Sequence, residues 1–191
     1  MLALVTGTFQ ACTSKKGTNN TDSTSTTTTT DVTKTAATDT SKLKPTADSA
    51  DIKFANKAAV GGMAEVALGK LALQKTANGQ IKDFANMMVN DHGKANDELM
   101  SIAKTKNIVL PATVDAEHQQ KMDDLSKKTG SEFDKAYVNA MVDGHKSTLS
   151  LMQDEAKNGK DADLKKFADK TSTVVQMHLD HITKIHDGMK Q

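Results

Sequence analysis

Residues 81–102 read "IKDFANMMVNDHGKANDELMSI", and the spacing of apolar side chains in this stretch predicts one long amphipathic helix. Apolar residues recur every three or four positions, so they share one face of a helix. His92 occupies a position on that face. A buried imidazole needs a hydrogen-bond partner or a metal ion, so its place there calls for an explanation. The face consists of Ile81, Phe84, Ala85, Met88, His92, Ala95, Leu99 and Ile102.

The same period continues through the rest of the chain after residue 51, where no sustained alternation typical of strands occurs. It predicts long helices over 52–77, from Gln80 to about Lys106, from behind Ser131 to residues 158–159, and after Asp161. A stop is expected at Asn78-Gly79, in left-handed backbone. Between the second and third long helices, Leu110-Pro111 breaks the pattern, and Asp115 is expected to cap a short amphipathic helix with Met122 and Leu125 as its apolar contacts.

These lengths predict an all-α protein, a ferritin-like four-helix bundle with a long crossover that contains a short helix between helices 2 and 3. The first and second long helices are joined by a few residues, as are the third and fourth, so each pair is expected to be antiparallel. The crossover of about 24 residues is long enough to run from one end of the bundle to the other. The second and third long helices are therefore expected to run in the same direction.

Each long helix offers one polar residue of metal-ligand type on its apolar face, namely Glu65, His92, His145 and His178. Parallel second and third helices would bring His92 and His145 to similar heights. Two arrangements satisfy such a buried set. Glu65 can bond directly to the histidines in a metal-free polar network that fixes the helix register. Alternatively, imidazoles and carboxylate coordinate one divalent transition metal ion.

Further residues beside this set are candidates for supporting roles. Asp91 and Asp143 are candidate partners of ligating histidines, and His181 lies about one turn beyond His178. Met88 precedes His92 by four residues and Met141 precedes His145 by four, so thioether and imidazole share a face twice. Thioether with imidazole suits Cu(I), although methionine also serves as a flexible filler of irregular cores.

The N-terminus resembles a bacterial lipoprotein signal. A short apolar run, Leu2 to Phe9, precedes Ala11 and Cys12, the only cysteine. We expect a signal peptide over residues 1–11, a lipid on Cys12, a disordered Ser/Thr-rich tether over 12–50 and the helical domain over 51–190. This places the protein in the cell envelope, in the periplasm or at the outer membrane, with the membrane as a partner. The alternative is an ordinary buried N-terminal segment with an incidental cysteine.

Composition and motifs argue against several functional classes. Lysine and arginine total 25 against 24 acidic residues, which does not favour a nucleic-acid partner. Five phenylalanines, one tyrosine and no tryptophan leave little for stacking on bases. The sequence contains no glycine-rich phosphate loop, no Gly-x-Ser-x-Gly and no His-Glu-x-x-His. We therefore lean away from an enzyme and assign no catalytic residue.

Four segments carry a resemblance to a known family, namely "GGMAEVALGKLA" (61–72), "IKDFANMMVNDHGKANDEL" (81–99), "FDKAYVNAMVDGHKSTL" (133–149) and "DLKKFADKTSTVVQMHLDH" (163–181). Over about residues 51–188 the chain resembles domain-of-unknown-function family 4142 of exported, ferritin-like bacterial proteins. The resemblance implies a bundle fold and an envelope location but no activity. Di-iron bundles use Glu-x-x-His, whereas Val89 and Val175 stand three residues before His92 and His178, so a di-iron centre is not expected.

Two functions follow as expectations. The first is a lipid-anchored envelope protein whose bundle binds an unknown envelope protein partner, with the Glu/His set as structural core. The alternative is mononuclear binding of a transition metal, divalent or copper, for metal handling or oxidative-stress defence.

Overall fold

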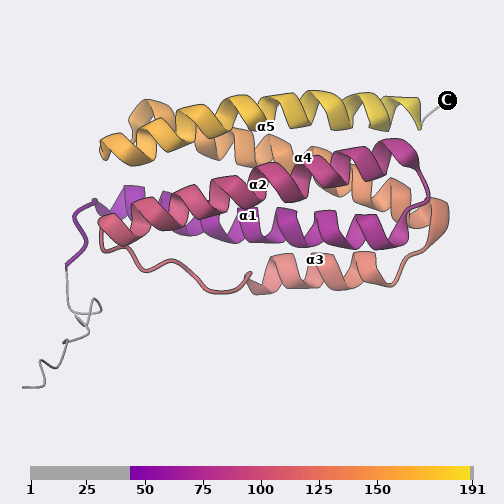
Figure 1. The fold of residues 1–191 in the computed structure, drawn as a ribbon, viewed down its shortest axis with the longest axis horizontal. Helices are drawn as coiled ribbons and strands as arrows, with labels where there is room; N and C mark the ends of the chain where they lie inside the picture. Colours follow the sequence, from indigo (N-terminus) through magenta and orange to yellow (C-terminus); the bar gives the residue numbers. More distant parts are fainter. Residues whose placement is uncertain (1–43, 190–191) are drawn as a thin grey trace, which may run out of the picture. The chain divides into compact units, whose positions relative to one another are not determined.

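A computed structural model describes residues 44–189 of the chain and contains helices joined by turns and loops, with no strand in that range. The helices are α1 (Ser49–Lys75), α2 (Gly79–Thr105), α3 (Ala116–Ser126), α4 (Gly130–Asn158) and α5 (Ala162–Gly188). The all-α prediction is confirmed, with a short helix in the crossover (Figure 1). The predictions for the signal peptide, for Cys12 and for most of the tether concern residues outside the described range.

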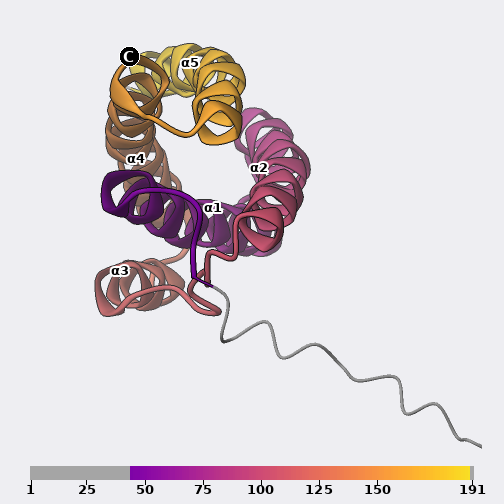
Figure 2. The same ribbon diagram turned by 90° about the vertical axis from the view of Figure 1, so that its left-hand side faces the viewer.

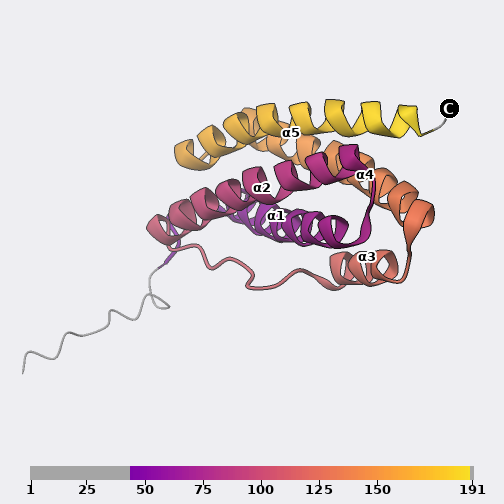
Figure 3. The same cartoon turned by 45° about the vertical axis from the view of Figure 1, so that its right-hand side comes forward.

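The four long helices form an antiparallel bundle whose topology is the predicted one. In Figure 1, α1 and α5 run in one direction while α2 and α4 run in the other. Viewed from the end, α1 neighbours α2 and α4, and α5 neighbours the same two helices, so α2 and α4 lie diagonally opposite each other (Figure 2). The crossover returns along the bundle and places α3 outside it, against α1 and α4 (Figure 3).

Side-chain caps explain where most helices begin. The carboxylate of Asp115 accepts from the backbone N–H of His118, and that of Asp161 accepts from Asp163 and Leu164, as the predicted caps of α3 and α5 require. The expected left-handed stop at Asn78-Gly79 is wrong. Helix α1 ends earlier, before an extended Thr76, and Asn78 instead caps α2 by accepting from the N–H groups of Gln80 and Ile81. Asparagine is favoured both as a helix N-cap and in a left-handed stop, and apolar periodicity does not distinguish the two roles.

The helical domain begins a few residues before the predicted boundary at 51. The N–H of Thr46 donates to the carbonyl of Lys106, and the side chain of Asp48 caps α1 at Ala50 and Asp51. The last residues of the predicted tether therefore belong to the folded unit, because an aspartate cap begins the helix ahead of its first large apolar residue.

The core consists of two apolar clusters separated along the bundle axis by a polar layer. One cluster surrounds Phe84 and Tyr137, and the other surrounds Phe54 and Phe167. In every long helix one buried residue of metal-ligand type falls between the positions that supply these clusters. The residues of this layer are Glu65, His92, His145 and His178. Apolar packing above and below keeps water from the layer.

Glycines on α1 allow α2 to approach closely at this height. A Cβ on Gly69 would lie 3.1 Å from the backbone oxygen of Ala85 and 3.2 Å from the Cβ of Met88. A Cβ on Gly62 would lie 2.0 Å from the side-chain oxygen of Asn96. The small residues flanking Glu65 therefore bring the α1 and α2 backbones together. Within residues 44–189, no helix combines the length and the hydropathy needed to cross a membrane.

Candidate metal centre

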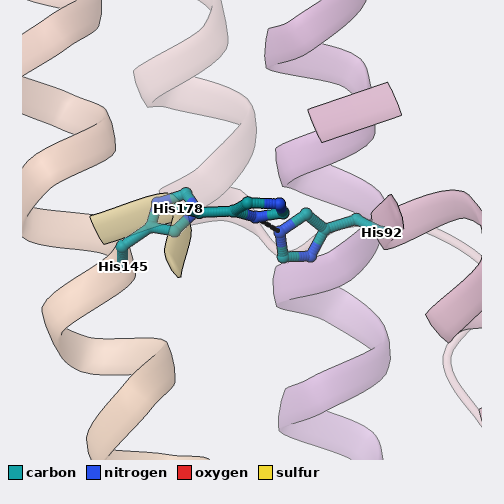
Figure 4. Close-up of side chains that lie close together, drawn as sticks. All are labelled: His92, His145 and His178. Carbon is teal, nitrogen blue, oxygen red and sulfur yellow. Dashed lines mark hydrogen bonds between the residues drawn. The ribbon is translucent and has the colours of Figure 1, made fainter. Parts of the chain in front are cut away.

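Three imidazoles from α2, α4 and α5 converge in the polar layer. His92 is 4% exposed, and His145 and His178 are fully buried. The ring centroid of His92 lies 5.7 Å from that of His145 and 5.2 Å from that of His178, and the last two lie 5.8 Å apart. Figure 4 shows the three side chains, henceforth the histidine triad, pointing toward one another. The parallel course of α2 and α4 produces this meeting, as the sequence predicted.

Both ring nitrogens of His92 are engaged. Its Nδ1 lies 2.8 Å from Oε2 of Glu65, in an ion-pair contact that fixes the outer edge of the ring. Its Nε2 lies 3.2 Å from Nδ1 of His178, the contact drawn as a dashed line in Figure 4. The other oxygen of Glu65, Oε1, accepts a hydrogen bond from the hydroxyl of Thr148 at 3.1 Å. His92 therefore joins a carboxylate on one side to another triad member on the other.

The other two rings are held in the same manner, through their outer nitrogens. Nε2 of His178 lies 3.1 Å from Oδ2 of Asp91. Nδ1 of His145 donates to the carbonyl of Met141 at 2.8 Å, which leaves Nε2 of His145 as a buried nitrogen with no hydrogen-bond partner among residues 44–189. Each ring thus has one nitrogen bound to an oxygen acceptor, an arrangement typical of metal-ligating histidines.

Charge in the layer is concentrated on Glu65 and His92. Burial alone would raise the pKa of Glu65, but the adjacent charge of His92 and the hydroxyl of Thr148 hold it at about 2. Burial likewise opposes a charged His92, yet Glu65 raises the pKa of that imidazole above its ordinary value. Burial and the charge of His92 lower the pKa of His178 to about 4, and burial also lowers the pKa of His145. Without metal, these opposite pKa shifts favour a charged pair, a protonated His92 beside an ionised Glu65.

The donor geometry of the triad fits a single metal ion. One nitrogen from each ring lies within 4.8 Å of the others. An ion in the plane of three nitrogens, with bonds of ~2.0–2.1 Å, would require those nitrogens to lie about 3.5 Å apart. The contact between His92 and His178 is already close to that separation, and the partnerless Nε2 of His145 is the natural third donor. Small ring movements would close the triangle.

The structure alters the expected ligand set. Glu65 is not part of the converging group, because its carboxylate contacts the outer nitrogen of His92 rather than the centre of the triad. It is a positioning residue for His92. Asp91 takes the outer position expected of it, but its partner is His178 on α5 and not the adjacent His92.

The remaining candidates lie around or away from the centre. Met88 and Met141 are buried in the apolar cluster beside the triad. His181 is partly buried and packs edge-on against Phe84, with ring centroids 5.9 Å apart. Asp143 is exposed, and within residues 44–189 no contact joins its carboxylate to a triad histidine. The pairing expected for Asp143 is not observed, because a residue two positions before His145 faces away from the helix side that carries it.

Two residues near the layer were not identified from the sequence. Thr148 follows His145 by three positions, so helical spacing alone would have placed it near the centre. Tyr137 is fully buried, and its hydroxyl has no hydrogen-bond partner within the range that the structure describes. Burial together with the charge of Glu65 raises the pKa of Tyr137. A tyrosine on an apolar stripe gives no signal that separates it from ordinary core.

Comparisons with known proteins place this geometry in context. Among solved structures, the chain is similar to CopM in the Cu(I)-bound form, with a TM-score of 0.62 and 13% sequence identity over 74% of this chain and 98% of that one. At that identity the likeness is one of fold. No curated protein matches the sequence. A family model matches residues 32–185, and the chain therefore belongs to the family described as a domain of unknown function, DUF4142.

Proposed function

We propose that this protein binds one Cu(I) ion through His92, His145 and His178 and serves in copper handling. The observation that carries the proposal is the convergence of three buried imidazoles, each held through its outer nitrogen, around the partnerless Nε2 of His145. A buried nitrogen without a partner costs free energy, and a metal ion bound there would recover it.

The charge of the layer favours a monovalent ion. In the metal-free protein the proton on His92 balances the carboxylate of Glu65. Cu(I) carries the same charge as that proton, so exchanging one for the other leaves the net charge of this buried layer unchanged. A divalent ion would add a further positive charge in a buried layer, opposed only by the partly exposed carboxylate of Asp91 beside His178, and burying such a charge is costly.

Coordination preference supports the same ion. Imidazole is a good ligand for copper, and the triad offers three donors without an exposed position for further water ligands. CopM, which shares the fold, has been solved with Cu(I) bound. A protein of this architecture therefore accommodates that ion.

The test is a Cu(I) titration of the full chain under reducing, oxygen-free conditions, against a chromophoric competing chelator. Cys12 is replaced by serine throughout, so that the thiol does not contribute. We expect one Cu(I) per chain, and we expect His145→Ala to abolish tight binding because it removes the partnerless donor. Overlapping affinities for the parent and His145→Ala proteins would contradict the proposal.

A matched control separates the triad from histidines in general. His186 also stands beside a carboxylate, with Nδ1 3.4 Å from Asp187, but it lies near the end of α5, away from the triad. His186→Ala should leave the stoichiometry and the affinity for Cu(I) unchanged.

We also propose that the domain is exported and anchored to a membrane of the envelope through a lipid on Cys12. The apolar run before Cys12 and the Ser/Thr-rich stretch after it support this location. An exported domain would meet copper before the ion reaches the cytoplasm.

A further inference from the structure

A cavity of about 470 Å³ opens on the side of the bundle where α1, α4 and the crossover meet. Figures 2 and 3 show the crossover and α3 running along this side. Its lining combines apolar surface with polar side chains, among them Asn56, Ser147 and Thr148. The side-chain oxygen of Asn56 is buried and has no hydrogen-bond partner in the described part of the chain. Volume and lining are those of a site that admits small ligands.

A chain of polar contacts connects this cavity to the histidine triad. Thr148 lines the cavity, and its hydroxyl donates to Oε1 of Glu65 at 3.1 Å. Oε2 of the same carboxylate lies 2.8 Å from Nδ1 of His92. A cation that reaches Thr148 therefore lies next to the buried, anionic carboxylate of Glu65. Glu65 in turn contacts His92 of the triad. Apolar clusters close the bundle above and below the triad, and the partly exposed Asp91 beside His178 is the other polar contact of the triad that reaches the surface.

A histidine–carboxylate pair stands at the outer part of the cavity. Nδ1 of His118 lies 2.6 Å from Oδ1 of Asp115, both residues line the cavity, and the side chain of His118 is 30% exposed. This contact orients the imidazole through one nitrogen and leaves Nε2 for a ligand. The pair repeats the arrangement of Glu65 with His92 at a position that solvent reaches.

We propose that this cavity is the route by which Cu(I) reaches the triad, with His118 as its first ligand and Glu65 as its last contact before His92. The inference rests on the proposed function, because it assumes that the triad binds the ion. It adds an access route and a transit ligand. Both affect the rates of Cu(I) loading and release and leave the equilibrium affinity unchanged.

Gly61 offers a way to block the cavity without disturbing the triad. It lines the cavity, and a Cβ added there would meet nothing within 4 Å. In a Cys12→Ser full chain, we would measure loading of Cu(I) from a chromophoric chelator, release to a stronger chelator, and the equilibrium affinity. Gly61→Leu should slow loading and release alike by about tenfold, or ~1.4 kcal/mol of barrier, while the affinity stays constant.

Gly144 provides the matched control. A Cβ on this α4 glycine also meets nothing within 4 Å, and Gly144 does not line the cavity, so Gly144→Leu should load at the parent rate. Gly61→Ala, whose single added carbon fits the open space, should fold as the parent does and slow loading less than leucine. Loading of Gly61→Leu at the parent rate would overturn the route and leave the triad standing. A parent protein that does not bind Cu(I) would overturn the proposed function instead.

His118 is tested separately. His118→Ala should slow loading several-fold at low Cu(I), with unchanged affinity, because a transit ligand affects the rate and not the end state. His186→Ala, which removes a histidine paired with Asp187 at 3.4 Å, should change neither quantity. Equal loading rates for the His118→Ala and parent proteins would overturn the assignment of His118 as first ligand.

Discussion

The three histidines of the triad are alike in type and differ in what holds them. Glu65 holds His92, Asp91 holds His178, and a main-chain carbonyl holds His145. Only Asp91 among these acceptors has a substantially exposed side chain, at 32%. The strongest electrostatic influence on the triad therefore comes from the buried carboxylate of Glu65.

Replacing Glu65 by glutamine should weaken Cu(I) binding without abolishing it. The amide keeps the shape of the side chain but loses the charge that stabilises a cationic centre. Loss of such an outer partner typically lowers metal affinity by about 10–100-fold. Chelator competition should show that fall with the stoichiometry still at one ion per chain. Glu98→Gln, which removes an exposed carboxylate paired with Lys170 on the bundle surface, should have no effect. Equal affinities in Glu65→Gln and the parent would show that Glu65 does not position His92.

For single residues, the sequence identified which side chains come together in the polar layer but not how their rings are oriented. Helical spacing places Glu65, His92, His145 and His178 on inner faces, and the topology brings them to one height. Ring orientation depends on which acceptor each outer nitrogen finds, and those acceptors come from other helices. Asp91 contacts His178 on α5 although it is adjacent to His92 in sequence, and no single-helix pattern contains that pairing.

Among the elements, α1 and α2 pack closely against each other, and Gly69 limits their separation. A Cβ at this position would press on the backbone of Ala85 and on the Cβ of Met88, neither of which moves easily. Gly69→Ala should therefore destabilise the protein by about 1–2 kcal/mol, since overpacking outweighs the gain in helix propensity. Gly61→Ala, where the space is open, should instead stabilise it by ~0.5–1 kcal/mol. Urea unfolding of both variants measures the contrast, and equal stabilities would contradict this view of the α1–α2 contact.

The joint between α4 and α5 contains a buried acidic pair. Both carboxylate oxygens of Asp51 accept from the backbone at the start of α5, from the N–H groups of Lys160 and Asp161. Glu155, 6% exposed, lies beside Asp51. Burial, and then the charge of Asp51, raise the pKa of Glu155 to about 7.

That raised pKa predicts a pH-dependent stability. The folded protein binds the proton of Glu155 more tightly than the unfolded chain does, so this contribution is fully present below about pH 4.5 and is lost as the pH rises through about 7. Glutamine is a neutral mimic of protonated Glu155, so Glu155→Gln should not show this loss. Its free energy of unfolding relative to the parent should therefore increase from pH 5 to pH 8, on the order of 2 kcal/mol. Urea unfolding at both pH values provides the measurement, with the exposed Glu117→Gln as control. A stability difference between Glu155→Gln and the parent that does not change with pH would contradict the assignment.

Some helix boundaries follow from local side-chain chemistry, and others do not. Asp115 and Asp161 cap helices where the sequence predicts. Asn78 was misassigned because the extended backbone of Thr76, two residues earlier, ends α1. The direction of α4 followed from the length of the crossover. The docking of α3 against α1 and α4 depends on tertiary packing that periodicity does not encode.

On the scale of the whole molecule, a polar layer lies between two apolar clusters and a cavity leads toward that layer from one side. The apolar clusters stabilise the bundle without metal. The layer leaves one donor nitrogen, Nε2 of His145, for a metal ion to bind. The architecture is therefore compatible with the proposed uptake of Cu(I) after folding.

The location of the chain is tested at its N-terminus. Cys12→Ser should release the protein from membranes into the soluble fraction, because stable anchoring requires more than one acyl chain and Cys12 is the proposed site of their attachment. Fractionation of cells that express each form provides the measurement. Ser14→Ala, two residues further on, is the control and should remain with the membranes. Persistent attachment of Cys12→Ser would contradict the lipid anchor.

X-ray absorption at the copper edge of the Cu(I)-loaded Cys12→Ser chain decides whether the triad is the metal centre. We expect a three-coordinate ion with nitrogen neighbours at roughly 2 Å, together with the outer-shell scattering of imidazole rings, and we expect this signal to disappear in His145→Ala. A shell of sulfur neighbours from Met88 or Met141, or a spectrum that His145→Ala leaves unchanged, would show that the three histidines do not hold the ion.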